Sequence, residues 1–329
     1  MADSSNPFAI RFHQTGGPEV LAAEPIEVGE PGPGQVRLRH EAIGLNFIDT
    51  YFRSGLYPVE LPGGLGNEAA GLVEAVGTDV TDFAVGDRVG YFTGPVGAYA
   101  THRLVEADRL VKLPDGISSE QAAAAMLKGC TAEYLIGRCA RVEPGQWVLV
   151  HAAAGGVGSI AVQWLKAIGA MVIAHSGNPA KARIAIDLGA DVSLDCAMEE
   201  LAAKVRDVTG AAGVPVILDG VGAASWEASL ASLARRGLMV SYGNASGPVP
   251  AFDMLELMRR GSVFVTRPTL FDYCATPAEM RVSADRLFGM MLSGKVQVQI
   301  GARYPLADAA EAHRALEGRQ TTGSTVLMV

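Results

Sequence analysis

The chain has 329 residues, of which 49% are hydrophobic and 19% charged, with 39 glycines. This composition excludes an intrinsically disordered chain, and the length allows two domains with separate cores. The 35 acidic against 27 basic side chains give a net charge of −8, so no nucleic-acid partner is expected. The first eight residues lack a secretory-leader pattern and no apolar run approaches about 18 residues. We therefore expect a cytoplasmic protein with no membrane partner.

The first 130 residues contain short apolar or alternating runs. Examples are Gln35–Ala42, Gly71–Val76 and Arg88–Tyr91, which are separated by clusters of glycine and proline. Short alternating runs between turn residues predict a compact, mostly β domain.

From Trp147 onward, apolar strands alternate with helical segments. This alternation predicts βαβ units in a parallel sheet covered on both faces. The six expected strands are Trp147–Ala152, Met171–His175, Asp191–Leu194, Val214–Asp219, Leu238–Tyr242 and Val263–Thr266. The predicted fold class is therefore α/β, with a doubly wound nucleotide-binding domain.

The tail after Leu270 changes pattern again. It contains a polar helix at Pro277–Ser293, a strand, a helix near Ala307–Leu316 and a last strand at Ser324–Met328. We expect this tail to fold back onto the first domain. The expected domains are residues 1–128 with 268–329, and residues 129–267.

The strongest local motif is the sequence VLVHAAAGGVGS at residues 148–159, which precedes a helical stretch. A strand that runs through a glycine-rich turn into a helix presents free N–H groups and the positive end of the helix dipole to a pyrophosphate. A glycine-rich turn alone is weak evidence, because many such turns only connect elements. Its position at the first of six βα units favours a dinucleotide site.

The segment after the second expected strand indicates which dinucleotide binds. An NAD site usually has an acidic residue there, but this chain has HSGNPAKAR at residues 175–183. Small polar groups and the Lys181 cation suit the 2′-phosphate of NADPH. Arg183 is better explained as part of a solvated helix face.

The motifs together resemble the medium-chain dehydrogenase/reductase superfamily and, within it, the bacterial NADPH quinone oxidoreductases. The resemblance runs nearly end to end. The matching motifs are NFIDTY (46–51), RSGLY (53–57), GNEAAG (66–71), GDR (86–88), KGCT (128–131), HAAAGGVG (151–158), RGLMV (236–240) and TRP (266–268). The resemblance implies a GroES-like mostly-β catalytic domain and a Rossmann domain.

The resemblance also implies the absence of zinc. Zinc-dependent members have cysteine where this chain has Asn46, and a Gly-His-Glu motif where it has Gly66, Asn67 and Glu68. Asparagine is a poor zinc ligand, and the four scattered cysteines do not form a structural zinc lobe. We therefore expect no metal site and no Lewis-acid alcohol chemistry.

Site residues are carried over from the family pattern. The implied catalytic residues are Asn46, Tyr51, Tyr57 and Lys128. The implied cofactor contacts are Phe47, Ile48, Asp49, Thr50, Thr131, Tyr134, Gly155, Gly156, Val157, Gly158, Ser176, Gly177, Lys181, Gly243, Asn244, Ala245, Ser246, Pro268, Thr269, Leu270 and Arg319. A tyrosine hydroxyl can donate to a quinone oxygen, and Lys128 can stabilise its charge. Tyr57 can equally be a packing residue.

One position departs from the family pattern. Related quinone reductases carry Asn-Tyr after the third strand, with the tyrosine near the adenosine phosphate, whereas this chain has Asp195 and Cys196. This change removes a contact and adds a negative charge. How strictly the chain prefers NADPH over NADH stays open.

The sequence also leaves open the acceptor, and whether a quinone receives one electron or two. A quinone and an enone or enal both accept hydride from a nicotinamide, and some relatives are structural or RNA-binding proteins without activity. The retained glycine turn favours the enzyme. A hydrolase is disfavoured because no G-x-S-x-G motif occurs, and His151 is interpreted as a packed histidine. By resemblance, the sixth strand is expected to pair with a second copy in a homodimer.

Overall fold

The structure is a computed structural model that describes residues 7–329. Residues 1–6, to which the expectation about a secretory leader partly refers, lie outside the described residues. The described chain forms two compact units. The first consists of residues 7–128, 274–292 and 298–329, and the second of residues 129–273 and 293–297. The expected domain bounds at 128 and 267 stay a prediction.

The first unit is built on two sheets. In the larger one, strands β15, β16, β3, β5, β6 and β8 lie side by side in that order, and β7 also pairs with β3. The smaller has the order β2, β1, β4. The strands are β1 (Phe8–Phe12), β2 (Ala22–Pro25), β3 (Gln35–Leu45), β4 (Gly63–Gly64), β5 (Ala69–Val76), β6 (Arg88–Tyr91), β7 (His102–Glu106), β8 (Val111–Lys112), β15 (Ile300–Pro305) and β16 (Ser324–Met328).

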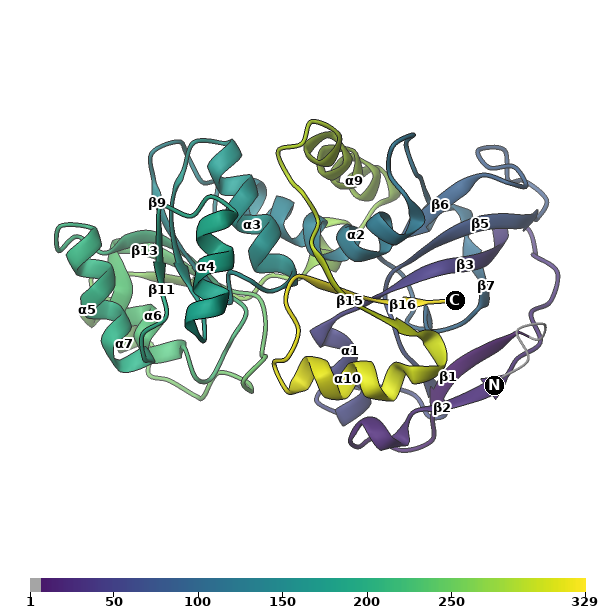
Figure 1. Cartoon of the computed structure of the whole chain (residues 1–329), viewed down its shortest axis with the longest axis horizontal. Coiled ribbons are helices and arrows are strands. Elements are labelled where there is room, and N and C mark those ends of the chain that lie inside the picture. Colours follow the sequence, from purple (N-terminus) through teal and green to yellow (C-terminus); the bar gives the residue numbers. More distant parts are fainter. Residues whose placement is uncertain (1–6) are drawn as a thin grey trace. The chain divides into compact units, whose positions relative to one another are not determined.

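The C-terminal strands complete the sheet of the first unit. β16 runs antiparallel to β3, with Thr325 opposite Leu45 and Met328 opposite Ala42. Figure 1 shows β15 and β16, in yellow, beside β3. The tail therefore folds back onto the first unit, as its sequence pattern predicted.

Helices of the first unit flank these sheets. They are α1 (Phe47–Ser54), α9 (Pro277–Leu292) and α10 (Ala309–Glu317), and α2 (Ser119–Glu133) continues into the second unit. Helix α1 begins where the Asp49 carboxylate accepts the Asn46 N–H at 2.9 Å, and it ends at Gly55, whose φ of 81° suits glycine. The core includes Phe12, Leu38, Ile43, Leu65, Tyr91 and Leu327.

The second unit is a six-stranded parallel sheet with the order β11, β10, β9, β12, β13, β14. Its strands are β9 (Trp147–His151), β10 (Met171–His175), β11 (Val192–Leu194), β12 (Val214–Asp219), β13 (Leu233–Ser241) and β14 (Phe264–Thr266). This is the doubly wound order 3-2-1-4-5-6 of dinucleotide-binding domains. The predicted α/β fold class is therefore confirmed.

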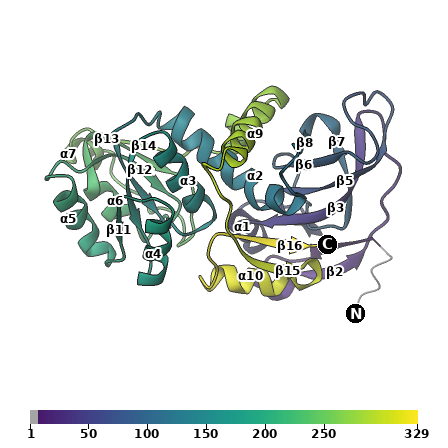
Figure 2. The same cartoon turned by 45° about the horizontal axis from the view of Figure 1, so that its top comes forward.

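Helices cover both faces of this sheet. They are α3 (Gly156–Ala167), α4 (Pro179–Asp187), α5 (Met198–Val208), α6 (Trp226–Ser232), α7 (Leu255–Arg259) and α8 (Leu270–Tyr273), and a π-helical turn spans Tyr134–Cys139. Helices α3 and α4 pack on one face of the sheet, and α5 and α6 pack together on the other (Figure 2). The core of the unit includes Leu149, Ile173, Val205, Ile217, Trp226 and Met239.

Candidate active site

The first strand-to-helix turn of the second unit leaves no room for a side chain. A Cβ on Gly158 would lie 2.3 Å from the Ala152 carbonyl oxygen and 2.8 Å from the Ala153 Cα. A Cβ on Gly155 would lie 3.1 Å from the same oxygen. Both contacts are with main-chain atoms, which cannot move away as a flexible side chain can. Position 158 therefore requires glycine, and the first N–H groups of α3 have no partner within the helix, which suits an anion.

The next strand end carries an unsatisfied hydroxyl. Ser176, directly after β10, is 2% exposed, and within residues 7–329 its Oγ has no hydrogen-bond partner. Buried hydroxyls in folded proteins almost always have a partner, so this atom fits a bound polar ligand. A Cβ on the neighbouring Gly177 would meet nothing within 4 Å. A side chain at position 177 would therefore enter open space.

Helix α4 begins immediately beyond this point. The Asn178 side chain accepts the Lys181 backbone N–H at 2.9 Å, and Pro179 occupies the first helical position. This cap fixes Lys181 in the first turn of α4, close in sequence to Ser176. The hydroxyl, the helix N-terminus and the lysine together suit a phosphate group.

A buried polar network joins the strands beneath these ends. His151 and His175 lie opposite each other on β9 and β10, with their Nδ1 atoms 3.3 Å apart. His151 Nε2 lies 2.8 Å from Ser229 Oγ, which donates to Asp219 Oδ2 at 2.8 Å. Burial lowers the pKa of His151 to about 4, although Asp219 raises it. His151 is therefore a neutral, hydrogen-bonded core histidine, as the sequence predicted, and not a base.

The segment Asp195–Cys196 contacts the same network. His175 Nε2 lies 3.1 Å from the Cys196 carbonyl oxygen. Burial lowers the pKa of His175, while Cys196, Asp219 and Asp195 act in the opposite direction. The main chain at Cys196 thus contacts the buried histidine pair.

The segments that follow β12, β13 and β14 contact one another. A Cβ on Gly243 would lie 2.4 Å from the Gly220 carbonyl oxygen, so the turns after β12 and β13 touch through backbone. The Arg267 guanidinium, just after β14, donates to the carbonyl oxygens of Ser241 at 2.9 Å and Gly243 at 3.2 Å. It also donates at 3.1 Å to the Asn244 amide oxygen in the amide orientation that satisfies both groups.

Arg267 thus holds the turn that contains four of the predicted cofactor contacts. Sequence reasoning missed this residue, although the quoted motif Thr266-Arg-Pro268 contains it. The available clue was its place directly before the predicted contact Pro268. A motif match could not show that the guanidinium turns back to the preceding strand end.

Tyr134 and Thr131 lie in a buried part of the second unit. The Tyr134 ring stacks on Tyr273 with centroids 4.5 Å apart, and the Arg138 guanidinium lies 5.3 Å from the Tyr273 ring. Burial raises the pKa of Tyr134 far above its ordinary value, so its hydroxyl stays protonated. Tyr134 can therefore serve as a fixed hydrogen-bond donor.

In the first unit, the predicted residues Asn46 and Lys128 meet at one carboxylate. Glu68 Oε1 accepts from Asn46 Nδ2 at 2.7 Å and from Lys128 Nζ at 3.1 Å. Its Oε2 accepts from the Leu127 N–H at 2.7 Å. Glu68 is fully buried and Lys128 is 5% exposed. Such a buried ion pair is stable only when additional donors complete it, as they do here.

Asp49 faces the protein interior. It is fully buried, and its carboxylate accepts from the Asn46 N–H, from Asn67 Nδ2 at 3.2 Å and from the Tyr99 hydroxyl at 3.0 Å. Its side chain is thus engaged by the protein itself. A cofactor contact of Asp49 stays a prediction that concerns its backbone.

The two candidate tyrosines lie together. The rings of Tyr51 and Tyr57 meet edge to face with centroids 5.3 Å apart, and Tyr57 also contacts Phe52 at 5.6 Å. Tyr51 is buried and Tyr57 half-buried. Tyr57 therefore packs, and whether its hydroxyl also meets a substrate stays a prediction.

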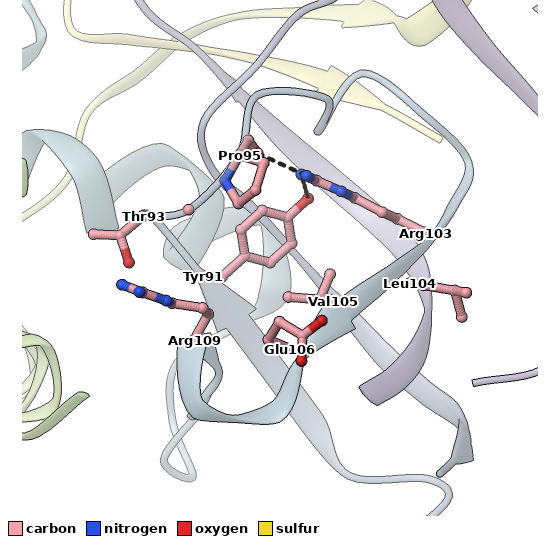
Figure 3. Close-up of a pocket in the computed structure, with 9 residues that line it drawn as sticks. Tyr91, Thr93, Pro95, Arg103, Leu104, Val105, Glu106 and Arg109 are labelled. Atoms are coloured by element: carbon pink, nitrogen blue, oxygen red, sulfur yellow. Dashed lines mark hydrogen bonds between the residues drawn. The ribbon is translucent and has the colours of Figure 1, made fainter. Parts of the chain in front are cut away.

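A pocket of about 300 Å³ in the first unit lies apart from these residues (Figure 3). Arg103 lies across it and donates to the Pro95 carbonyl oxygen at 2.6 Å and to the Tyr91 hydroxyl at 3.4 Å. No residue predicted for the site lines this pocket. The structure therefore does not associate it with the predicted chemistry.

Comparison with known proteins identifies the family. The alcohol dehydrogenase GroES-like domain matches residues 32–115, and the zinc-binding dehydrogenase family matches residues 156–273. A Pseudomonas aeruginosa quinone oxidoreductase is 51% identical over 97% of this chain and 98% of the relative. The chain belongs to the quinone oxidoreductase family of the medium-chain dehydrogenase/reductase superfamily. The predicted resemblance is therefore confirmed.

Solved members of the quinone oxidoreductase family share the whole fold. The Escherichia coli quinone oxidoreductase complexed with NADPH is 45% identical, with a TM-score of 0.96 over 98% of this chain and 100% of that chain. A 2-haloacrylate reductase from a Burkholderia species is 42% identical over 97% of this chain and 98% of the relative.

The zinc-binding dehydrogenase match raises the question of a metal, and the residues do not fit one. An ammonium and an amide nitrogen donate to Glu68, and neither has a lone pair for a cation. In residues 7–329, no group of three or more His, Cys, Asp or Glu side chains is placed to hold a metal ion. Asn46 and Lys128 donate to Glu68 instead, and Asn67 donates to Asp49.

The glycine turn yields a prediction about stability. Gly158→Ala should lower the free energy of unfolding by about 1–3 kcal/mol, because the new Cβ meets the Ala152 carbonyl at 2.3 Å. Gly177→Ala is the matched control, since its Cβ enters open space, and should change the free energy by less than about 0.5 kcal/mol. Urea unfolding measures both. Equal stability of the two variants would contradict the packing argument.

Asp49 yields a prediction about pH. Burial raises its pKa from 3.8 to about 7, although bonds from Asn46 and Tyr99 lower it. Between these values the folded chain holds a proton that the unfolded chain has lost, so this group makes the free energy of unfolding fall as pH rises. Asp49→Asn removes that contribution. As pH rises from 4 to 7, the free energy of unfolding of the variant should therefore increase relative to that of the native chain by about 1 kcal/mol per pH unit.

Urea unfolding at several pH values between 4 and 7 tests this slope. Asp115→Asn, at an exposed acid of the same unit, is the control and should leave the slope unchanged. An Asp49→Asn slope identical to the native one would show that Asp49 is ionised throughout the window.

Proposed function

We propose that this chain is an enzyme that reduces quinones with hydride from NADPH, without a metal ion. The observation that carries the proposal is the glycine turn at Gly158 beside the unpartnered Ser176 hydroxyl. These two features fit the pyrophosphate and the 2′-phosphate of a dinucleotide. Family membership supports the reaction class, because relatives at 51% and 45% identity are named quinone oxidoreductases. The solved E. coli relative contains NADPH.

The proposed contact set is divided by the part of NADPH that each group of residues would meet. The pyrophosphate is assigned to Gly155–Gly158, and the 2′-phosphate to Ser176, Gly177, Lys181 and Arg319. The nicotinamide side is assigned to Asn46, Phe47, Ile48, Asp49, Thr50, Thr131 and Tyr134. Residues Gly243–Ser246 and Pro268–Leu270 complete the contacts at carboxyl strand ends, where open α/β sheets bind ligands.

NADPH, when bound, would supply the hydride. The residues of the chain hold the acceptor and stabilise the negative charge that develops on it. Asn46 orients Glu68, which fixes Lys128, and the Lys128 ammonium stabilises negative charge that develops on the quinone oxygen. The hydroxyl of Tyr51 or Tyr57 places one proton on that oxygen and regains a proton from solvent. With the hydride on one carbonyl oxygen of the quinone, the negative charge lies on the other carbonyl oxygen, and the single proton placed there completes the hydroquinone.

A second acceptor class has support of its own. The Burkholderia relative at 42% identity is named for reduction of a 2-haloacrylate, an electron-poor alkene. In an enone or enal the hydride adds to the alkene carbon, and the same tyrosine hydroxyls protonate the neighbouring carbon. We therefore place enones, enals and haloacrylates second to quinones.

We also propose that the chain forms a homodimer and works in the cytoplasm, where NADPH is available. Strand β14 is the edge of its sheet, and Phe264 on it is 59% exposed. Met254 and Met258 nearby in sequence are also exposed. An apolar sheet edge favours pairing with a second copy. In the described chain, no helix is both long and apolar enough to span a membrane.

The reaction is tested by NADPH oxidation with purified protein. We expect turnover with 1,4-benzoquinone and naphthoquinones to exceed turnover with a panel of enones, enals and 2-haloacrylate. Prior treatment with a chelator, or addition of Zn²⁺, should leave the rate unchanged. Faster alkene reduction would favour the second acceptor class, and loss of activity after chelation would reject the metal-free proposal.

The same assay separates the enzyme from a structural or RNA-binding relative. An enzyme should bind NADPH with saturation, while a structural protein need not. Absence of NADPH binding together with absence of reduction of every acceptor would reject the enzyme proposal.

The dimer is tested by native mass. We expect twice the 34.3 kDa mass of one chain. Phe264→Arg should shift the protein toward the single-chain mass, because a charge at the paired edge must be buried. Val282→Arg is the control, at a residue 49% exposed on α9, and should leave the mass unchanged. A native protein with the single-chain mass would refute the dimer.

A further inference from the structure

A single buried arginine joins helix α1 to helix α10. Arg53, in the last turn of α1, is 2% exposed. Its guanidinium donates to His313 Nδ1 at 2.8 Å and to Glu317 Oε1 at 2.7 Å, and its Nε donates to the Gly16 carbonyl oxygen at 3.1 Å. A buried guanidinium is stable only when acceptors such as these bind its N–H groups. Since His313 and Glu317 are four residues apart, they present one face of α10 to Arg53.

The donors on Arg53 fix the direction of a longer hydrogen-bond chain. Arginine only donates, so His313 Nδ1 must accept, and the neutral imidazole carries its hydrogen on Nε2. Burial and the Arg53 cation lower the pKa of His313 to about 3, which keeps the ring neutral. His313 Nε2 then donates to the Tyr99 hydroxyl at 3.1 Å, and Tyr99 donates to Asp49. All the bonds therefore run from Arg53 toward Asp49.

The series of hydrogen bonds ends at the start of α1. Asp49 accepts the Asn46 N–H at 2.9 Å, and the Asn46 amide in turn donates to Glu68. Every link from Arg53 to Asn46 is buried. Both ends of α1 are thus fixed by one network, through Arg53 in its last turn and through Asn46, the residue that caps its start.

The opposite branch leads to Arg319. The Arg319 N–H donates to the Leu316 carbonyl oxygen at 3.1 Å, which ties the backbone at Arg319 to the last turn of α10, and the φ of 55° at Arg319 turns the chain out of the helix. The last turn of α10 carries Glu317, and the turn before it carries His313. A displacement of that turn from Arg53 would move the Arg319 backbone with it.

We propose that Arg53 is a positioning residue that holds the two ends of the NADPH contact set in the first unit, Asn46 at the nicotinamide side and Arg319 at the 2′-phosphate side. This inference rests on the proposed function. Arg53 is buried and is not one of the proposed cofactor contacts. It acts on Asn46 through His313, Tyr99 and Asp49, and on Arg319 through its hydrogen bonds to His313 and Glu317 of α10. The loss of Arg53 therefore combines two effects that are separable by experiment.

The test uses full-length Arg53→Lys, which keeps the charge but cannot hold His313 and Glu317 in one planar fork. Dissociation constants for NADPH and NADH, and kcat with a quinone, are measured for each protein. We expect NADPH affinity to fall about 10-fold and NADH affinity by less than about 3-fold, because only NADPH has the phosphate that Arg319 meets. We expect kcat to fall by a similar factor with either nucleotide, because Asn46 serves both.

Three further variants keep the result interpretable. Glu317→Gln, at the exposed end of the network, should fold normally and weaken NADPH about 3-fold with little change for NADH. Arg314→Met removes an exposed cation from the same helix and should leave both affinities unchanged. Arg319→Ala should itself weaken NADPH selectively.

The outcomes distinguish the inference from the proposed function. One outcome is that Arg319→Ala loses NADPH affinity selectively, while Arg53→Lys and Glu317→Gln keep the native preference for NADPH over NADH. This outcome would overturn the positioning role of Arg53 and leave the proposed function intact. Equal loss of both nucleotides in Arg319→Ala would remove Arg319 from the phosphate site and overturn the inference at that end. Failure of the native protein to bind either nucleotide would reject the proposed function itself.

Discussion

A backbone contact that leaves no space for a side chain organises the second unit. Where β9 enters α3, the Ala152 carbonyl lies so close to Gly158 that a Cβ would stand 2.3 Å from its oxygen. This contact packs the turn tightly and lets the helix begin at Gly156 with its N–H groups unobstructed. The neighbouring strand ends follow from the same parallel order, because parallel strands bring their carboxyl ends to one edge of the sheet. The proposed dinucleotide contacts of this unit all depend on that arrangement.

Buried carboxylates hold the surrounding structure in place. Asp219 accepts from Ser225 and Ser229 beneath the strand ends, Glu68 accepts from Lys128 and two other donors, and Asp49 accepts from three. A buried carboxylate without donors would be strongly destabilising, so each one imposes a geometry on the segments that supply them. At Glu68 the donor set is also what makes the cluster unsuitable for a cation. The same electrostatic requirement therefore shapes both the fold and the chemistry available to it.

The sequence predicted Met171–His175, Val214–Asp219 and Ser324–Met328 with the bounds that the structure shows, because apolar runs between turn residues are local patterns. Asp49 shows the limit of the same reasoning. A family motif predicts that it lies near the cofactor, but the structure shows its carboxylate turned toward Asn67 and Tyr99. No pattern in the motif reports the direction of a side chain.

By itself, the sequence determined the fold class, the family, the glycine turn and the lack of zinc-ligand types at positions 46 and 67. These properties follow from residue type, periodicity and short spacing, which act over a few residues. Only the tertiary structure decided the partners of the buried charges. Arg53 meets His313 across 260 residues of sequence, and Arg267 turns back to Ser241. Such pairings arise because a buried charge must find donors or acceptors wherever the folded chain brings them, and sequence spacing carries no record of that proximity.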